Sequence, residues 1–501
     1  MATAVDTFDN NVLLKLDTLR SAPGEIVTQG LPDSDIERFA KTDPSLVNAI
    51  DGALEEFERF RERYPDLAAA DESKQIHDMQ QGIVNFYAQD TVNPYVALAA
   101  RGPWIITTKG AVIHDSGGYG MLGQGHAPET VLAAMSKPHV MANVMTPSLS
   151  QMQLVDALRE EIGHTRENGC DYESFVFMNS GSEAVTVAAR ISDVNARELT
   201  DPGARHDGKP IRMLALEGGF HGRTDRPAQY SDSTLQTYSR YLASFRDGSR
   251  LWTVPPNDSE ALRRIFARAD EEGVFIESMF LEPVMGEGNP GLAIERAFYD
   301  LARELTLAHG SLLLVDSIQA GLRTHGVLSI LDYPGFQDAE APDMETYSKA
   351  LNAGQFPLSV LALTKRAAGL YRRGVYGNTM TANPRALDVA IAVLAGLSPG
   401  LRRNICDRGE ELVTKLRQVA AETDGIITQV QGTGLLVAAE LADGYRSSGY
   451  ASVEEDMRRH GIGVIHGGHN ALRFTPHFAI TSAEIDLIVG QLKKALIRAS
   501  N

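Results

Sequence analysis

The sequence predicts an α/β protein in which a mostly parallel β-sheet, covered by helices on both faces, is joined to a smaller α+β part. Between about residues 147 and 388, apolar runs of strand length alternate with helical stretches. Nearly continuous apolar strands separated by helices are typical of parallel sheets that are buried on both faces. After about Pro384 the helices and strands follow in a different order, which indicates a second, smaller domain.

The larger part contains four clear candidate strands and one clear helix. The strands are expected at residues 174–178, 212–216, 275–284 and 312–315, and the helix at residues 184–197. Earlier in the chain, residues 104–113 have the pattern of a β-hairpin, and they lead into a glycine-rich loop at residues 117–125. Polar residues directly follow the candidate strands, which is where open α/β sheets place their ligands.

The two ends of the chain have patterns of their own. In the C-terminal part, helices are expected at 386–397, 409–421 and 482–499, and strands at 426–430, 435–441 and 472–475. Ser482 is a candidate N-cap of the last helix. At the other end, the apolar residues Leu46, Ile50, Leu54 and Phe57 fall on one face of a helix in an otherwise polar region.

These patterns divide the chain into four predicted segments. They are a helical N-terminal extension (1–80), the N-terminal part of the small domain (81–146), the large domain (147–388) and the C-terminal part of the small domain (389–501). The division agrees with the length, because 501 residues are too many for one hydrophobic core and suggest two or three domains.

Composition excludes several classes of partner. The net charge of −18 makes nucleic acid and membrane surfaces poor partners, because an acidic surface repels phosphate groups. Cys170 and Cys406 are too few for a disulfide framework, and no Cys/His spacing resembles a metal site. A reducing cytoplasm fits this cysteine usage best. We expect no signal peptide at residues 1–20 and no membrane-spanning segment.

The turn at residues 179–183 (Asn-Ser-Gly-Ser-Glu) is a candidate phosphate site. It follows a strand and opens a helix, so free backbone N–H groups and the hydroxyls of Ser180 and Ser182 would meet at the positive end of the helix. The same residues also match a capping box, in which Ser180 and Glu183 satisfy the helix terminus by themselves. The turn alone leaves both interpretations open.

Three further residues favour a cofactor with a protonated ring. Asp316 directly follows an apolar strand, and a buried carboxylate there needs a cation or hydrogen-bond donors. A protonated pyridine nitrogen would serve, and it is what makes pyridoxal phosphate an electron sink. Gln319 lies three residues on and could donate to the phenolate oxygen of such a ring. Phe220 follows another strand and could lie flat on the ring, although a core aromatic is the ordinary alternative.

Lys349 is the candidate nucleophile. It lies between the strand-and-turn segment at residues 341–346 and a glycine-containing loop. A lysine in a confined pocket can lose its proton and attack a carbonyl as an amine. A lone lysine is usually an ordinary surface residue, so this interpretation depends on the partners described above.

Taken together, the motifs resemble those of the class III aminotransferases, the ornithine and 4-aminobutyrate-like enzymes that use pyridoxal phosphate on fold type I. The resemblance covers roughly residues 100–495 and keeps the order of the motifs along the chain. The matching residues are 179–184, 220–224, 282–288, 316–321, 348–350, 378–384 and 472–476. The resemblance implies a seven-stranded, mostly parallel sheet in the large domain.

The resemblance also implies a role for each matching residue. Lys349 would hold the cofactor as a Schiff base and then transfer a proton, while Asp316 would pair with the pyridine nitrogen and Gln319 would lie near the phenolate oxygen. Ser180, Gly181 and Ser182 would bind the phosphate, with Phe220 stacked on the ring and His221 beside it. Thr379 would reach the phosphate of a neighbouring subunit, which implies a homodimer. Tyr119, Glu287 and Arg473 would contact the substrate, Arg473 through a carboxylate that Glu287 can mask.

The sequence departs from the family pattern at three places. The usual Asp-Glu after the strand is Asp316-Ser317, so a carboxylate is missing there. Residues 376–378 (Tyr-Gly-Asn) stand where relatives often have a histidine, and residues 380–382 replace a more glycine-rich or aromatic run. These changes bear on the substrate rather than on the cofactor.

The predicted function is therefore transfer of an amino group between an amine or amino acid and an oxo acid or aldehyde. Racemases, decarboxylases and aminomutases that use the same cofactor on the same fold remain alternatives, because residues around Lys349 do not separate these reactions. A non-catalytic binding or regulatory protein on an inherited fold is the second alternative, and the presence of Lys349, Asp316 and Gln319 together argues against it.

Overall fold

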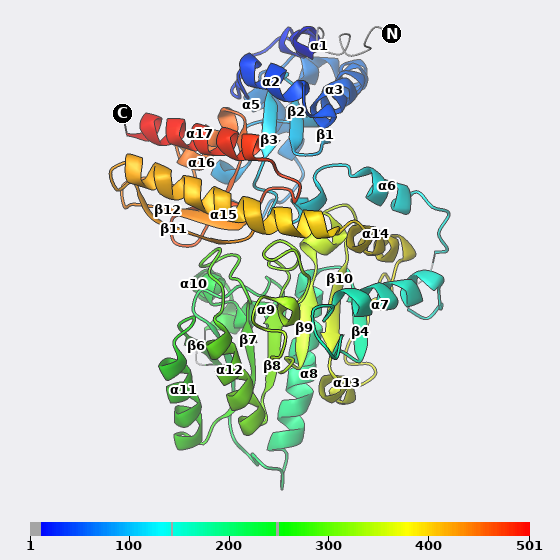
Figure 1. The fold of residues 1–501 in the computed structure, drawn as a ribbon, viewed down its shortest axis with the longest axis vertical. Coiled ribbons are helices and arrows are strands. Elements are labelled where there is room, and N and C mark those ends of the chain that lie inside the picture. The colour runs from blue at the N-terminus through cyan, green and yellow to red at the C-terminus, as the bar shows by residue number, and fades with distance from the viewer. Residues whose placement is uncertain (1–11, 142–143, 247–249, 501) are drawn as a thin grey trace.

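The computed structural model describes residues 12–141, 144–246 and 250–500, and its strands form three sheets. In Figure 1 the largest sheet and its helices occupy the lower half of the molecule, and the first and last described helices, α1 (Val12–Arg20) and α17 (Ser482–Ala499), lie in the upper half. No single helix among the described residues is long and apolar enough to cross a membrane. Only the bent pair α14 (Pro384–Ala395) and α15 (Pro399–Glu422), at 78° to each other, passes that test together.

The largest sheet has seven strands in the order β4-β10-β9-β8-β7-β5-β6. Its strands are β4 (Ser174–Met178), β5 (Ile211–Leu216), β6 (Leu251–Val254), β7 (Phe275–Leu281), β8 (Leu312–Asp316), β9 (Met344–Tyr347) and β10 (Ser359–Leu363). All neighbours pair in parallel except β10, which is antiparallel to both β4 and β9. The sheet confirms the predicted fold class. Strands β6 and β10 were not among the predicted strands.

Both faces of this sheet are buried, as the apolar strands predict. Along β8, Leu312 and Leu314 belong to one hydrophobic cluster, whereas Leu313 and Val315 belong to another, because alternate side chains of a strand point to opposite faces. Helix α8 covers the first face, and α11 and α12 cover the second. The helices of this part are α7 (Leu149–Glu161), α8 (Gly181–Thr200), α9 (Asp225–Tyr230), α10 (Asp232–Tyr241), α11 (Ser259–Glu271), α12 (Arg296–His309), α13 (Lys365–Leu370) and α14 (Pro384–Ala395).

The C-terminal part forms a four-stranded sheet with helices along it. Its strands, in the order β11-β12-β15-β14, are β11 (Ile427–Thr433), β12 (Leu436–Leu441), β15 (Ala471–Phe474) and β14 (Ile465–Gly467). The helices are α15 (Pro399–Glu422), α16 (Val453–Arg459) and α17 (Ser482–Ala499). The expected N-cap of α17 was wrong by one residue: Thr481 is the cap, and its hydroxyl accepts from the backbone N–H of Glu484.

The third sheet joins the N-terminal part to the C-terminal part. It consists of β1 (Ala97–Arg101), β2 (Trp104–Thr107), β3 (Val112–Asp115) and β13 (Ile462–Gly463), and β2 and β3 form the predicted hairpin. The helices before and beside it are α1 (Val12–Arg20), α2 (Asp33–Ala40), α3 (Pro44–Arg63), α4 (Pro65–Ala68), α5 (Glu72–Gln80) and α6 (Glu129–Met135). Helix α3 packs on β1 and β2, and the indole of Trp104 donates to the α3 cap residue Asp43 at 2.6 Å. Residues 1–11 of the predicted extension lie outside the described residues.

Candidate active site

A cavity of about 170 Å³ lies at the carboxyl ends of the central strands of the large sheet. Eight of its residues are those that the sequence predicted for the cofactor: Ser180, Gly181, Ser182, Phe220, His221, Asp316, Gln319 and Lys349. Four lining residues were not among them: Gly222, Glu282, Ile318 and Ser348. Segments up to 169 positions apart therefore converge on one cavity, as expected for strand ends that meet at the same edge of a sheet.

The first turn of α8 forms one wall of the cavity. Ser180 is the N-cap and forms a full capping box with Glu183, so the capping interpretation is correct. The capping box does not exclude a phosphate, because the first N–H groups of a helix have no partner within the helix. Glycine is needed at two places in this wall. A Cβ at Gly181 would lie 2.7 Å from Ile318, and one at Gly222 would lie 2.5 Å from the Ser182 hydroxyl.

Asp316 is buried at the end of β8 with donors on both carboxylate oxygens. Nδ1 of His221 lies 2.9 Å from one oxygen, and the hydroxyl of Thr346 donates to the other at 3.0 Å. Nε2 of His221 is buried and has no hydrogen-bond partner among the described residues. The carboxylate is thus held at the edge of the cavity by residues of two other segments.

Glu282 is a site residue that the sequence analysis did not single out, although it lies in a matching motif. Its carboxylate accepts from the backbone N–H groups of Phe220 and Gly286, each at 2.9 Å, and so joins the loops after β5 and β7. Burial and the neighbouring charge of Asp316 raise the pKa of Glu282 to about 7, while His221 acts to lower it. A pKa near 7 lets both the neutral and the ionised form of this carboxyl be populated at neutral pH.

Lys349 reaches the same cavity from the segment that follows β9. Burial and the charge of Arg473 lower the pKa of the Lys349 amine to about 8. The negative charges of Glu287, Asp316 and Glu282 act in the opposite direction and raise it. Roughly a tenth of such an amine is neutral at pH 7, far more than for an exposed lysine. The backbone of Lys349 has φ of 48°, a left-handed conformation that is uncommon for a residue other than glycine.

Arg473 and Glu287 form an ion pair beside the cavity. The guanidinium of Arg473 is buried, and its Nη1 donates to Glu287 Oε2 at 2.9 Å, to the carbonyl of Gly286 and to the side chain of Gln319 at 3.4 Å. The structure therefore brings the two predicted substrate residues into direct contact and links them to a cofactor residue.

Tyr119 lies at the border of a second, larger cavity of about 490 Å³. Its ring is 5.6 Å from the ring of Tyr87, and the guanidinium of Arg473 lies 5.9 Å from it. The next residue, Gly120, passes close to Lys349, because a Cβ at Gly120 would lie 3.6 Å from the Lys349 side chain. The glycine-rich loop thus lines the larger cavity and passes beside Lys349 of the smaller one.

Arg323 holds this loop in place and was missed by the sequence analysis. Its fully buried guanidinium donates to the carbonyls of Gly120, Leu435 and Pro476. Burial, together with the charge of Arg473, lowers the pKa of Arg323 to about 9. Thr379, in contrast, is exposed and does not line the cofactor cavity of its own chain.

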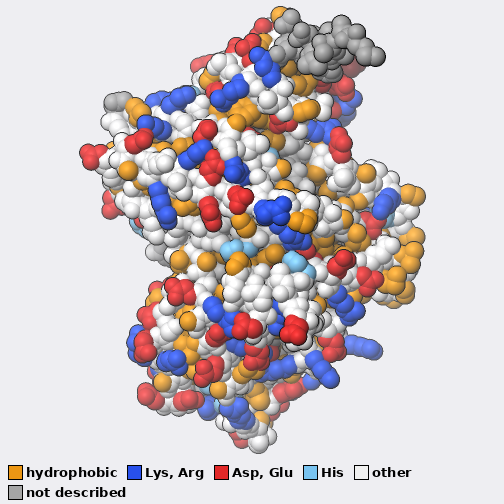
Figure 2. All heavy atoms as spheres, in the orientation of Figure 1, with side chains coloured by type: hydrophobic (Ala, Val, Ile, Leu, Met, Phe, Trp, Pro, Cys, Tyr) orange, Lys and Arg blue, Asp and Glu red, His pale blue; other side chains and the backbone are white. Residues whose placement is uncertain are grey.

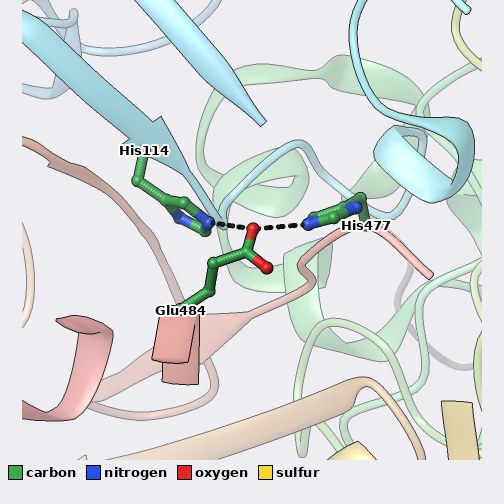
Figure 3. A group of neighbouring side chains, drawn as sticks. All are labelled: His114, His477 and Glu484. Carbon is green, nitrogen blue, oxygen red and sulfur yellow. Dashed lines mark hydrogen bonds and ion pairs between the residues drawn. The ribbon is translucent and has the colours of Figure 1, made fainter. Parts of the chain in front are cut away.

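A buried cluster of His114, His477 and Glu484 ties the base of the glycine loop to α17 (Figure 3). One oxygen of Glu484 lies 3.1 Å from His114 Nε2 and 2.8 Å from His477 Nε2. The sequence offered no metal-ligand spacing, yet these three ligand atoms lie within 4.8 Å of one another, as a metal site would require. With a metal on both Nε2 atoms, the buried Nδ1 of His114 would carry a proton, and it has no partner among the described residues. Hydrogen bonding fits this cluster better than a metal does.

Comparison with known proteins identifies the family. Residues 86–496 match the model of the family described as aminotransferase class-III. The chain belongs to the class III aminotransferases. An acetylornithine aminotransferase of Thermosynechococcus vestitus is 30% identical over 64% of this chain and 74% of its own length. An ornithine aminotransferase of Bacillus subtilis is 26% identical over 86% of this chain and 100% of its own length.

Solved structures agree with this family in fold. An ornithine aminotransferase of Toxoplasma gondii, with pyridoxal phosphate partly occupying its active site, has a TM-score of 0.72 and 23% identity, covering 88% of this chain and 98% of the other. An aminotransferase of Bacillus anthracis has a TM-score of 0.70 and 20% identity, and the match covers 85% of this chain and 98% of the other. The aminotransferase thus has fold type I and depends on pyridoxal phosphate, as the sequence resemblance implied.

The residues of the cavity fit this cofactor. The wall at Gly181 and Ser182 suits a phosphate, the held carboxylate of Asp316 suits a protonated pyridine nitrogen, and the amine of Lys349 suits the aldehyde. When bound, the cofactor supplies an electron sink for the charge that forms when a proton leaves the donor carbon.

Proposed function

We propose that this aminotransferase takes a donor whose reacting amine is terminal, far from the donor's carboxylate, and passes the amino group to a 2-oxo acid. The observation that carries the proposal is the ion pair between Arg473 and Glu287. While the pair is closed, the carboxylate of Glu287 occupies the guanidinium that would bind the carboxylate of a 2-amino acid. The relatives named ornithine and acetylornithine aminotransferase support a donor of this kind.

Lys349 and Asp316 would carry the proton chemistry. The neutral amine of Lys349 would accept the proton that leaves the donor carbon and would later give that proton back. Asp316 would keep the pyridine nitrogen protonated, and His221 and Thr346 hold Asp316 in place. Arg473 then releases Glu287 and binds the carboxylate of the acceptor, since a planar guanidinium matches a carboxylate at two points.

A panel of donors tests the substrate proposal, with a matched variant at Glu287. Each donor is mixed with the enzyme without an acceptor, and conversion of the cofactor is followed by its visible absorbance. We expect terminal-amine donors to react faster than 2-amino acids such as glutamate. In Glu287→Gln the reaction with glutamate should rise about tenfold, because Arg473 is no longer neutralised. Equal rates for both donor types in the native enzyme, unchanged in the variant, would contradict the proposal. Persistent cofactor absorbance with racemised or decarboxylated product would favour the alternative reactions.

The enzyme is proposed to act as a homodimer. An apolar surface between α6 and α7 is exposed, and it accounts for the orange area on the right of Figure 2. It includes Val140, Met141, Val144, Met145, Leu149 and Met152, with exposed fractions from 57% to 100%. A contiguous apolar surface of this kind marks a protein interface. Thr379, exposed and outside its own cavity, is proposed to reach the phosphate in the neighbouring subunit.

Mixing two inactive variants tests the shared site. In the proposed dimer, each site takes Lys349 from one chain and Thr379 from the other. A dimer of one Lys349→Ala chain and one Thr379→Ala chain therefore has one site in which both residues are native. We expect refolded or co-expressed mixtures to recover far more than the summed activity of the two variants. A mixture no more active than that sum would contradict a site shared between subunits. Co-purification of differently tagged chains serves as the control that mixed dimers form.

A further inference from the structure

Glu345 carries a buried carboxylate beneath the cofactor cavity. It lies on β9 with no exposed surface, and among the described residues no lysine, arginine or histidine pairs with it. One oxygen accepts from the hydroxyl of Ser317 at 2.5 Å and from the N–H of Ile330 at 3.0 Å. The other accepts from the hydroxyls of Tyr172 at 2.8 Å and Ser329 at 2.6 Å.

Ser317 connects this carboxylate to the cofactor cavity. It directly follows Asp316 and precedes Ile318 and Gln319, and these three neighbours all line the cavity. Its backbone is held as well, because its N–H donates to the carbonyl of Thr346 at 3.0 Å and its carbonyl accepts from Gly321 at 2.8 Å. The side-chain bond to Glu345 is the third constraint on the turn.

Strand β9 therefore contacts the end of β8 through side chains on both faces of the sheet. Thr346 pairs with Asp316 in the sheet, and its hydroxyl donates to the Asp316 carboxylate. The preceding residue, Glu345, points to the opposite face and holds the turn through Ser317. The first contact holds the carboxylate of Asp316, and the second holds the turn that leads to Gln319.

We propose that Glu345 is a positioning residue for the cofactor site and that its carboxylate takes the place of the one missing at position 317. Position 317 itself carries no carboxylate, and under this proposal a residue of the neighbouring strand β9 supplies one. The inference rests on the proposed roles of Asp316 and Gln319 toward the cofactor, and it does not depend on the donor.

The proposal can be tested by moving the carboxylate from position 345 back to position 317. A glutamate at position 317 is longer than serine by a carboxymethyl group, and that group spans the 2.5 Å between the Ser317 hydroxyl and the Glu345 oxygen. With leucine at position 345, the carboxylate of the new glutamate would enter the space that the old one leaves. Its oxygens would then face Ser329, Ile330 and Tyr172.

The variants Ser317→Ala, Glu345→Leu and the double variant Ser317→Glu/Glu345→Leu test the proposal. Apoenzymes are titrated with pyridoxal phosphate, and the pH dependence of the visible absorbance of the bound cofactor is recorded together with thermal unfolding. We expect Ser317→Ala to weaken cofactor binding about tenfold, as for loss of one hydrogen bond to a charged group, and to shift the pH midpoint. Glu345→Leu should weaken binding further, because several buried donors lose their acceptor. The double variant should recover cofactor affinity to within about threefold of the native enzyme.

Ser329→Ala is the matched control, because it removes a bond to the same carboxylate without touching the turn. It should lower the unfolding temperature but keep the native cofactor affinity and pH midpoint. The proposal would be overturned if Ser317→Ala kept the native cofactor affinity and the native pH midpoint. It would also be overturned if Ser329→Ala and Ser317→Ala lost cofactor affinity to the same extent. A double variant that binds no better than Glu345→Leu would also overturn it. If Glu345→Leu does not fold, a double variant that does not fold either would likewise overturn the proposal. Because the titration uses no amino donor, failure of the donor proposal leaves this result unaffected.

Discussion

Replacing Lys349 with alanine is expected to reduce transamination by a factor of about 10⁴ or more, because one amine would both bind the cofactor and move the proton. Among the described residues, Lys349 is the only lysine that lines the 170 Å³ cavity, and the histidine there, His221, is engaged with Asp316. The measurement is the rate of cofactor conversion with an excess of the best donor. A small added amine such as methylamine should restore part of the rate, because it can accept the donor proton in place of the side chain.

Lys365→Ala provides the control, since Lys365 is exposed at the start of α13 and should leave the rate unchanged. The pH dependence adds a second check on Lys349. Its folded pKa of about 8 lies below the ordinary lysine value, so the neutral amine gains population as pH rises toward 8. The rate at which the native apoenzyme binds the cofactor aldehyde should follow this rise. Visible cofactor absorbance that survives in dialysed Lys349→Ala would contradict the assignment.

Replacing Asp316 with asparagine is expected to reduce the rate by a factor of about 10² to 10³, the usual effect of removing one preorganised electrostatic group. The side chain keeps its size, but it no longer favours a protonated pyridine nitrogen, so charge on the donor carbon is delocalised less effectively. The measurement is again the donor half-reaction, together with cofactor affinity. Binding should fall less than the rate does, since the phosphate wall and Lys349 remain.

Thr346→Val gives a graded comparison at the same carboxylate. It removes the 3.0 Å hydrogen bond to Asp316 and keeps the charge, so we expect a loss of about tenfold. The order of the effects is the decisive result. If Thr346→Val costs as much as Asp316→Asn, the orientation of the carboxylate matters more than its charge. If neither variant slows the half-reaction, Asp316 does not support the cofactor ring.

Much of the large domain could be predicted because its strands are locally distinctive. Runs such as residues 312–315 are apolar throughout and end in a polar residue, so both their type and the position of the site follow from local pattern. Strand β10 (Ser359–Leu363) is an apolar run too, but its place in the sheet does not follow from that run. It is antiparallel between β4 and β9, and its neighbours lie far away in the sequence or across an irregular loop.

By itself, the sequence determined the family, the cofactor and the residues that meet at the strand ends, because each of these follows from a local motif and from the order of motifs. The tertiary structure alone decided what those residues do to one another. The closed pair of Arg473 and Glu287, the hold of Arg323 on the glycine loop and the supply of a carboxylate by Glu345 all join segments that are distant in the chain. Such contacts depend on burial and strand register, which no local pattern contains.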